Sequence, residues 1–262
     1  ADNVTILNTH TINSNPSSNT VCHSLTVDNG GILDMNNSIY TFQTKINSGT
    51  CINNNGEIKN GYLYPKEASS ISGTGTYSEV GFVIATVRVN IDADVTFDKK
   101  ISTYSNAQII VNSGKTLTIN DEIEIISGSV VNNGSIVIGD ISNFFTGTNT
   151  SATKLQSDNG TLVIPSSMTI PAVINNTVGS IQVNNSVAAT CDYDLTIVNN
   201  LVNNGTFQST GSSTVTFNGS LSETQTDQSI SGSGTSNFEK IVFNNIGQNL
   251  NLTGSQINIS DL

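Results

Sequence analysis

The chain has 262 residues, of which only 11% are charged, and its 9 basic and 20 acidic residues give a formal net charge of −11. Nucleic-acid binding needs lysine and arginine to neutralise phosphates, so this composition excludes it, and the same deficit disfavours docking on anionic lipid. No apolar run approaches the roughly 20 residues needed to cross a bilayer, so we expect no membrane insertion. The apolar residues, 35% of the chain, fall in alternating runs, which favours a folded all-β protein over a disordered one.

Two of the three cysteines, Cys22 and Cys51, lie near the start of the chain. The chain opens directly on ADNVTI without a signal peptide, so we expect a mature protein or a part of a longer one. Cys22 and Cys51 are 29 residues apart, which could place them on nearby turns of a coil and allow one disulfide. The alternative is that these two residues and Cys191 are small buried hydrophobic residues.

Two stretches rich in serine, threonine and glycine are candidate loop excursions from a regular fold. They cover residues 65–78 and 142–158 and show weak alternation. Loops on a rigid scaffold often carry binding residues. Within the second stretch, the aromatic pair Phe144 and Phe145 is a candidate binding-loop tip, although a buried anchor is the other interpretation and the one we favour.

A strand with clear period-2 alternation is predicted over residues 87–98. Its apolar side chains fall on one face, whereas Asp92, Asp94 and Asp98 fall on the other. Further along the chain, Glu122 and Glu124 form a similar pair. Clustered carboxylates could bind Ca²⁺ or act as the acid and base of glycoside hydrolysis. A solvated strand face is the simplest interpretation and ranks first, Ca²⁺ second and catalysis third. We therefore expect no catalytic residues and no cofactor, with calcium as the one candidate.

Short phrases recur along the chain. ISG-x-GT occurs at 71–76 and 230–235, and VNNG occurs at 131–134 and 202–205. Asn-x-Gly and Asp-x-Gly turns separate the alternating runs, because both residue types tolerate positive φ. The spacing of these turns suits a coil of roughly 20–26 residues per turn. The sequence thus predicts one elongated domain over 1–262, an all-β, right-handed parallel β-helix (β-solenoid) with degenerate rungs.

The final sixty residues carry the pattern F-x-G…Q-x-I-x-G-x-G-T…F-x-x-I-x-F-N-N. Its positions are Phe217, Gly219, Gln228, Ile230, Gly232, Gly234, Thr235, Phe238, Ile241, Phe243, Asn244 and Asn245. This pattern, with the opening ADNVTI and HTI, resembles the β-helical repeat regions of large secreted surface proteins of Bacteroidetes bacteria. The resemblance implies export by the type IX route and a role in adhesion, motility or surface coating. The C-terminal sorting domain usual for that route is not visible in this sequence.

These observations predict a secreted, non-catalytic structural or adhesive surface protein. Because the open end of a solenoid is an unpaired strand edge, we expect the chain to stack end to end into filaments. Two alternatives stay open. One is a carbohydrate-binding module that docks an extracellular glycan, with or without calcium, and the other is a polysaccharide lyase or hydrolase. The expected partners are therefore a second copy of the chain or an extracellular glycan.

Overall fold

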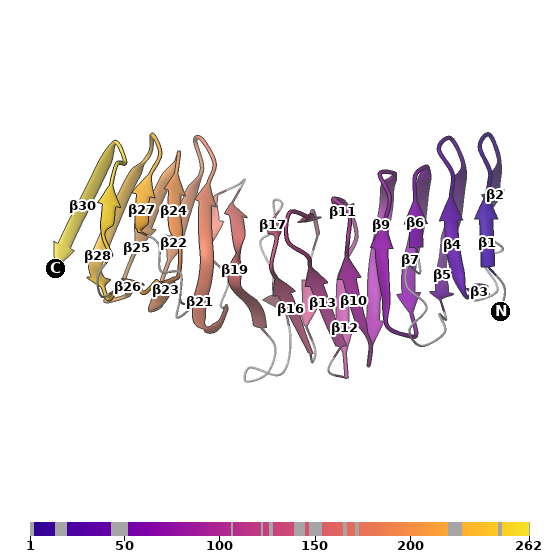
Figure 1. Ribbon diagram of the computed structural model, residues 1–262, viewed down its shortest axis with the longest axis horizontal. Coiled ribbons are helices and arrows are strands. Elements are labelled where there is room, and N and C mark those ends of the chain that lie inside the picture. The colour runs from indigo at the N-terminus through magenta and orange to yellow at the C-terminus, as the bar shows by residue number, and fades with distance from the viewer. Residues whose placement is uncertain are drawn as a thin grey trace. The chain divides into compact units, whose positions relative to one another are not determined.

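A computed structural model of the chain is an all-β coil (Figure 1). It describes residues 3–13, 20–42, 52–105, 107–121, 123–125, 128–138, 145–146, 154–164, 167–170, 173–219, 227–245 and 248–261. These residues form strands and turns and no helix, and the neighbouring strands pair in parallel. The chain divides into two compact units, Ala1–Val131 with Asn143–Lys154, and Asn132–Ser142 with Leu155–Leu262. Each unit is described by itself below.

The first unit has two principal faces. The first face consists of β1 (Asn3–Ile6), β4 (Ser24–Val27), β6 (Ile52–Asn54), β8 (Ser69–Ser72), β10 (Arg88–Ile91) and β13 (Ala107–Val111). The second face consists of β2 (Thr11–Asn13), β5 (Ile32–Phe42), β7 (Glu57–Pro65), β9 (Thr76–Ala85), β12 (Ile101–Tyr104), β15 (Ile123–Ile125) and β18 (Phe145–Thr146). On the first face β13 pairs further with β16 (Gly128–Asn132), and the remaining strands, β3 (Thr20–Cys22), β11 (Val95–Phe97) and β14 (Thr116–Ile119), complete the turns.

The second unit repeats this arrangement. Its strands are β17 (Ser135–Ile138), β19 (Lys154–Ile164), β20 (Met168–Thr169), β21 (Val173–Val183), β22 (Ala188–Cys191), β23 (Leu195–Ile197), β24 (Asn200–Asn203), β25 (Thr206–Ser209), β26 (Thr214–Phe217), β27 (Gln228–Ser231), β28 (Thr235–Phe243), β29 (Leu250–Leu252) and β30 (Gln256–Asp261). The long strand β28 pairs with β25 through its first half and with β26 through its second. One long strand can therefore run along two sides of a turn of the coil.

The strand registers give the length of each turn. Ile52 pairs with Ile71, 19 residues later, and Arg88 pairs with Gln108, 20 residues later. The longest interval, 29 residues, joins Leu201 to Ile230 and includes residues 220–226, which lie outside the described residues. The parallel β-solenoid with degenerate rungs is thereby confirmed, with intervals that extend slightly beyond the expected 20–26. Its right-handed sense stays a prediction.

Aliphatic side chains from successive turns stack into continuous columns inside each unit. In the first unit, a column runs through Leu25, Ile52, Ile71, Ile91 and Val111, all at most 2% exposed. In the second, the corresponding column runs through Leu162, Ile181, Leu201 and Ile230. Full burial of each such side chain contributes roughly 1.5–3 kcal/mol. A narrow apolar lumen therefore holds together a chain with few apolar residues.

Two sequence expectations need correction. The expected single strand over 87–98 is two strands, because the chain bends between Asp92 and Asp94. The candidate excursion at 65–78 is a regular part of the coil, since β8 pairs with β6 and β10 and β9 begins at Thr76. Its serines at 69, 70 and 72 lie in β8, and its glycines at 73 and 75 lie in the corner between β8 and β9. Most of the second candidate excursion, 142–158, lies outside the described residues.

Candidate functional site

The three aspartates singled out in the sequence lie at the corners around β11. Asp92 and Asp94 occupy the bend before this strand and Asp98 follows it. Each carboxylate accepts a hydrogen bond from the next turn. The donors are the Asn112 side-chain amide for Asp92, the Thr116 backbone N–H for Asp94 (2.8 Å) and the Asn120 side-chain amide for Asp98 (2.8 Å).

These contacts give the aspartates a structural role in joining successive turns. The described residues contain no group of three or more His, Cys, Asp or Glu side chains arranged to hold a metal ion. Asp92, Asp94 and Asp98 are each turned to a separate donor, and a calcium site at these residues stays a prediction. The side chains of Glu122 and Glu124 lie outside the described residues.

The same device recurs at other corners. Asp194 accepts a hydrogen bond from the Thr214 N–H at 2.7 Å. Asp227 accepts from the backbone N–H and side-chain amide of Asn249, and these bonds lower the pKa of its carboxyl group below the ordinary value. Anchoring by a carboxylate one turn away is thus a general feature of the coil.

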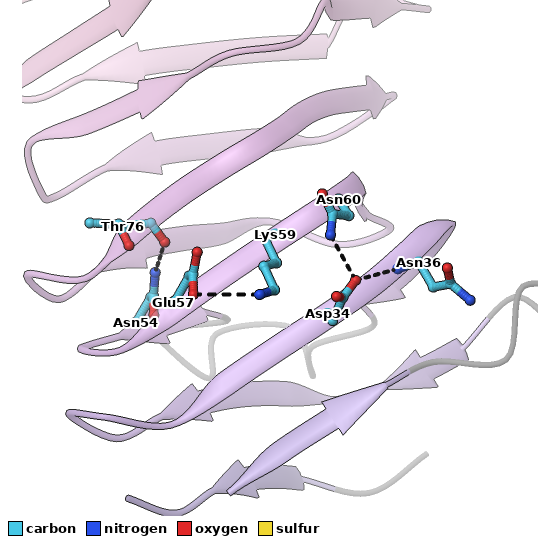
Figure 2. Close-up of polar contacts among 7 residues, drawn as sticks. All are labelled: Asp34, Asn36, Asn54, Glu57, Lys59, Asn60 and Thr76. Atoms are coloured by element: carbon cyan, nitrogen blue, oxygen red, sulfur yellow. Dashed lines mark hydrogen bonds and ion pairs between the residues drawn. The ribbon is translucent and has the colours of Figure 1, made fainter. Parts of the chain in front are cut away.

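A second anchoring group lies on β5 and β7 (Figure 2). The Asp34 carboxylate accepts hydrogen bonds from the Asn60 side-chain amide at 3.0 Å and from the Asn36 N–H at 2.9 Å. Partial burial opposes ionisation of Asp34, but these two bonds and the nearby Lys59 ammonium together lower its pKa. Asn36 and Asn60 have positive φ, and the register between β5 and β7 shifts between Asp34 and Ser38, so asparagine here accommodates a bulge in this strand pair.

The repeated phrases found in the sequence stack on one another. Asn54 is fully buried at the end of β6, and its side chain bridges the corner. Its Nδ2 donates to the Thr76 carbonyl at 2.9 Å (Figure 2), and its Oδ1 accepts from the Gly56 N–H at 3.1 Å. The backbone adds two further bonds, from Gly75 N–H to Asn54 O and from Thr76 N–H to Gly56 O. The ISG-x-GT phrase of one turn therefore lies directly on the N-N-G phrase of the turn before.

The second unit contains the same network. Asn203 Nδ2 donates to the Thr235 carbonyl at 2.8 Å, and Asn203 Oδ1 accepts from the Gly205 N–H at 3.0 Å. The Gly234 N–H donates to Asn203 O and the Thr235 N–H to Gly205 O. Sequence reasoning identified both phrases but missed that they stack. The signal was present, because each ISG-x-GT phrase follows an N-N-G phrase.

The cysteines are buried thiols where the structure describes them. Cys22 and Cys191 are free and at most 2% exposed. Burial raises the pKa of each thiol to about 11. The structure thus shows no disulfide at Cys22, and its expected partner, Cys51, lies outside the described residues. These two thiols match the alternative interpretation, that of small buried hydrophobic residues.

The candidate binding loop is described only in part. Phe144 lies outside the described residues. Phe145 begins β18, where its Cα pairs with that of Ile123 in β15. Whether the pair at 144–145 is a binding tip or a buried anchor is not tested, and both interpretations stay predictions.

The second face of the first unit carries tyrosines that sequence reasoning did not single out. Tyr62 and Tyr64 alternate with the buried Leu63 on β7, so their rings lie on the outer side of the coil. The Lys66 ammonium is 3.9 Å from the centre of the Tyr64 ring, and the Lys99 ammonium is 5.9 Å from that of Tyr62. The alternation Tyr-Leu-Tyr in the sequence could have indicated that both tyrosines lie on the outer side of a strand.

The first and last described turns expose lumen positions. Ile12 pairs with the buried Leu33 but is 41% exposed, and Leu252 pairs with the buried Ile230 but is 52% exposed. On β30, Ile257 and Ile259 continue the inward positions of Ser236 and Phe238 and are half-buried. Ile12 and Leu252 are thus more exposed than their partners Leu33 and Ile230 in the neighbouring turns.

No family model, curated protein or solved structure matches this chain in the comparisons made. Among the described residues, no helix is long and apolar enough to cross a membrane. The function is therefore inferred from the fold and from the contacts between turns.

Proposed function

We propose that the chain is a secreted, non-catalytic structural or adhesive cell-surface protein whose coils stack end to end into filaments. The observation that supports this proposal is the parallel β-solenoid itself, in which each turn is joined to the next by paired strands and by side-chain hydrogen bonds at the corners. Secretion by the type IX route and placement at the cell surface rest on the resemblance of the final sixty residues to surface-protein repeats.

The use of the polar side chains supports a structural role. Aspartates at 92, 94, 98, 194 and 227 accept hydrogen bonds from donors one turn away. Buried Asn54 and Asn203 fill corners in the same way. Groups that would be the first candidates for acid–base chemistry thus hold successive turns together.

The duplicated phrases define how one copy would meet the next. Aligning the two ISG-x-GT phrases places Ile71 level with Ile230 and Tyr77 level with Ser236. The column that ends at Leu252 then corresponds to the column that begins at Val4, through Leu25 and Ile52.

By the same alignment, the column that ends at Ile257 corresponds to the one that begins at Ile12. We therefore propose that β29 and β30 of one copy add in parallel to β1 and β2 of the next. Leu252 would contact the next copy's Val4, and Ile257 its Ile12. Head-to-tail contacts of this kind do not close, so they extend into a filament.

Cysteine trapping tests this register directly. Adjacent parallel strands lie about 4.8 Å apart, which is within the Cα separation that a disulfide accepts. A chain with Ile12→Cys and Ile257→Cys should form a ladder of covalent oligomers under mild oxidation. The matched control is Ile12→Cys with Asn258→Cys, because Asn258 is the next residue on the strand and points to the opposite side.

Electron microscopy of the unmodified chain over a range of concentrations gives the second readout. Filaments that disappear in Ile257→Asp but persist in Asn258→Asp would support stacking through the lumen. Separate short rods at every concentration, with no ladder from the cysteine pair, would refute end-to-end assembly.

A further inference from the structure

The outer side of the second face in the first unit is built as rows of aromatic and small side chains. Tyr62 and Tyr64 lie about 7 Å apart along β7, as alternate residues of a strand do. At the matching strand positions the next turn has the buried Gly81 and the half-buried Val83 and Ala85, and the turn after it has the buried Ser102 and the half-buried Tyr104. A strip of small side chains therefore separates the two tyrosine-bearing rows.

The Tyr62 ring lies directly against the glycine beside it. A Cβ atom at Gly81 would lie 2.4 Å from Cε1 and 2.6 Å from Cδ1 of this ring. The absence of a side chain at Gly81 thus allows the ring to lie against the sheet. A ring held in this way offers a flat apolar surface with little conformational entropy to lose on binding.

Two lysines are held over these rings instead of pairing with carboxylates. Lys66 is exposed and lies over Tyr64, while Lys99 lies over Tyr62 and donates to Asn37 Oδ1 at 3.4 Å. The ion pair that the structure shows among the described residues joins Lys59 to Glu57 instead. The ammonium groups of Lys66 and Lys99 therefore have no carboxylate within 4.0 Å in the described part of the chain.

Lysines gathered on one face are a notable feature in a chain with a net charge of −11 and nine basic residues. Lys100 follows Lys99 at the same corner, so three of the nine basic residues, Lys66, Lys99 and Lys100, lie on or beside the tyrosine face. Lysine ammoniums are compact point charges suited to carboxylate or sulfate groups, and tyrosines combine an apolar ring with a hydroxyl group.

We infer that this face, defined by Tyr62, Tyr64, Lys66, Lys99 and Tyr104, binds an extended acidic polysaccharide. The tyrosine rings stack on sugar rings, and Lys66 and Lys99 contact their carboxylates. The rows repeat at about 4.8 Å from turn to turn, so the surface suits a repeating polymer better than a single small molecule. This inference goes beyond the proposed function and does not depend on filament formation, because the face lies on the side of the coil.

The test uses the full chain and polygalacturonate as the probe, with dextran as the neutral polymer. Binding is measured by isothermal titration at a constant salt concentration. We expect Tyr62→Ala to weaken polygalacturonate binding at least tenfold and Lys66→Gln/Lys99→Gln to weaken it by a similar factor. The matched control, Lys115→Gln/Lys240→Gln, removes the same charge elsewhere and should change the affinity less than twofold. Unchanged urea midpoints would show that all variants remain folded.

Three outcomes would overturn the inference. They are no binding of polygalacturonate by the unmodified chain, equal losses in the two lysine pairs, and equally tight binding of dextran. Equal binding of a single-stranded polynucleotide would overturn the assignment to a sugar polymer. Filament assays on Ile257→Asp are independent of this face, so failure here leaves the stacking proposal intact, and the reverse also holds.

Discussion

The side-chain amide of Asn203 donates a hydrogen bond of 2.8 Å to the carbonyl oxygen of Thr235, which lies 32 residues later and one turn along the coil. The same amide also reaches the Ser236 hydroxyl at 2.9 Å. In the first unit, Asn54 and Thr76 repeat this relationship, and in the second unit Asn132 and Thr161 form the same bond at 3.1 Å. A buried asparagine at the end of one strand thus fixes the start of a strand in the following turn.

Replacing Asn203 should destabilise the protein strongly. Asn203→Ala leaves the Thr235 carbonyl and the Gly205 N–H without their side-chain partners in a buried corner. Since each unsatisfied buried group costs about 1–3 kcal/mol, we expect a loss of about 3 kcal/mol in the free energy of unfolding. Urea denaturation followed by circular dichroism measures it. Gln208→Ala, at an exposed position of the next strand, is the control and should change stability by less than about 0.5 kcal/mol. Equal effects would refute the anchoring role.

Gly232, in the stacked phrase, should be less replaceable than Gly114 and Gly211, two other glycines with positive φ. Gly232 has a φ of +103°, and a Cβ there would lie 2.2 Å from the Asn203 carbonyl oxygen. Gly114 and Gly211 also have positive φ, but a Cβ at either would meet nothing within 4 Å. We expect Gly114→Ala and Gly211→Ala to cost about 1–2 kcal/mol for the backbone conformation alone. Gly232→Ala should cost at least about 1–3 kcal/mol more because of the clash. Equal losses in urea titrations would show that stacking on Asn203 contributes nothing.

The Asp94 carboxylate should act as a hydrogen-bond acceptor and not as a calcium ligand. Asp94→Asn keeps an oxygen for the Thr116 N–H, so we expect stability to change by less than about 0.5 kcal/mol, whereas Asp94→Ala should lose about 1 kcal/mol. Thermal melts in EDTA and in millimolar CaCl₂ should coincide for all three chains. A calcium-dependent rise in the melting temperature of the unmodified chain that Asp94→Asn abolishes would instead establish a metal site.

The sequence allowed the fold class and the turn length to be predicted because both follow from local patterns. Alternation identified the lumen residues, and five of the six apolar positions expected on one face of 87–98 are buried: Val89, Ile91, Ala93, Val95 and Phe97. Alternation could not locate the bend at Asp92–Asp94, since the inward positions continue through it.

Contacts between turns could not be predicted in the same way. The donor for Asp94 is Thr116, 22 residues later, and the intervals between paired residues vary from 18 to 29. Without a fixed period, neither the partners of the aspartates nor the position of Lys99 over Tyr62 could be derived from spacing. In the sequence, only the repeated phrases indicated which residues lie on one another in successive turns, because ISG-x-GT follows N-N-G in both cases.

The buried thiols should make stability decline at alkaline pH. Burial raises the pKa of Cys22 and Cys191 to about 11, from an ordinary value of 9.0. The folded state therefore retains these protons where the unfolded chain releases them, so the stabilisation is complete below pH 9 and is lost as the pH rises towards 11. Urea midpoints measured between pH 8 and 11 should fall more steeply for the unmodified chain than for Cys22→Ala/Cys191→Ala.

Both chains should carry Cys51→Ser, so that the comparison reports only on the two buried thiols. In that background, a thiol reagent at pH 8 should react with neither cysteine until urea unfolds the chain, because only the thiolate is nucleophilic and both side chains are at most 2% exposed. Rapid labelling of the folded protein, or parallel pH profiles for the two chains, would show that these cysteines are not buried as described.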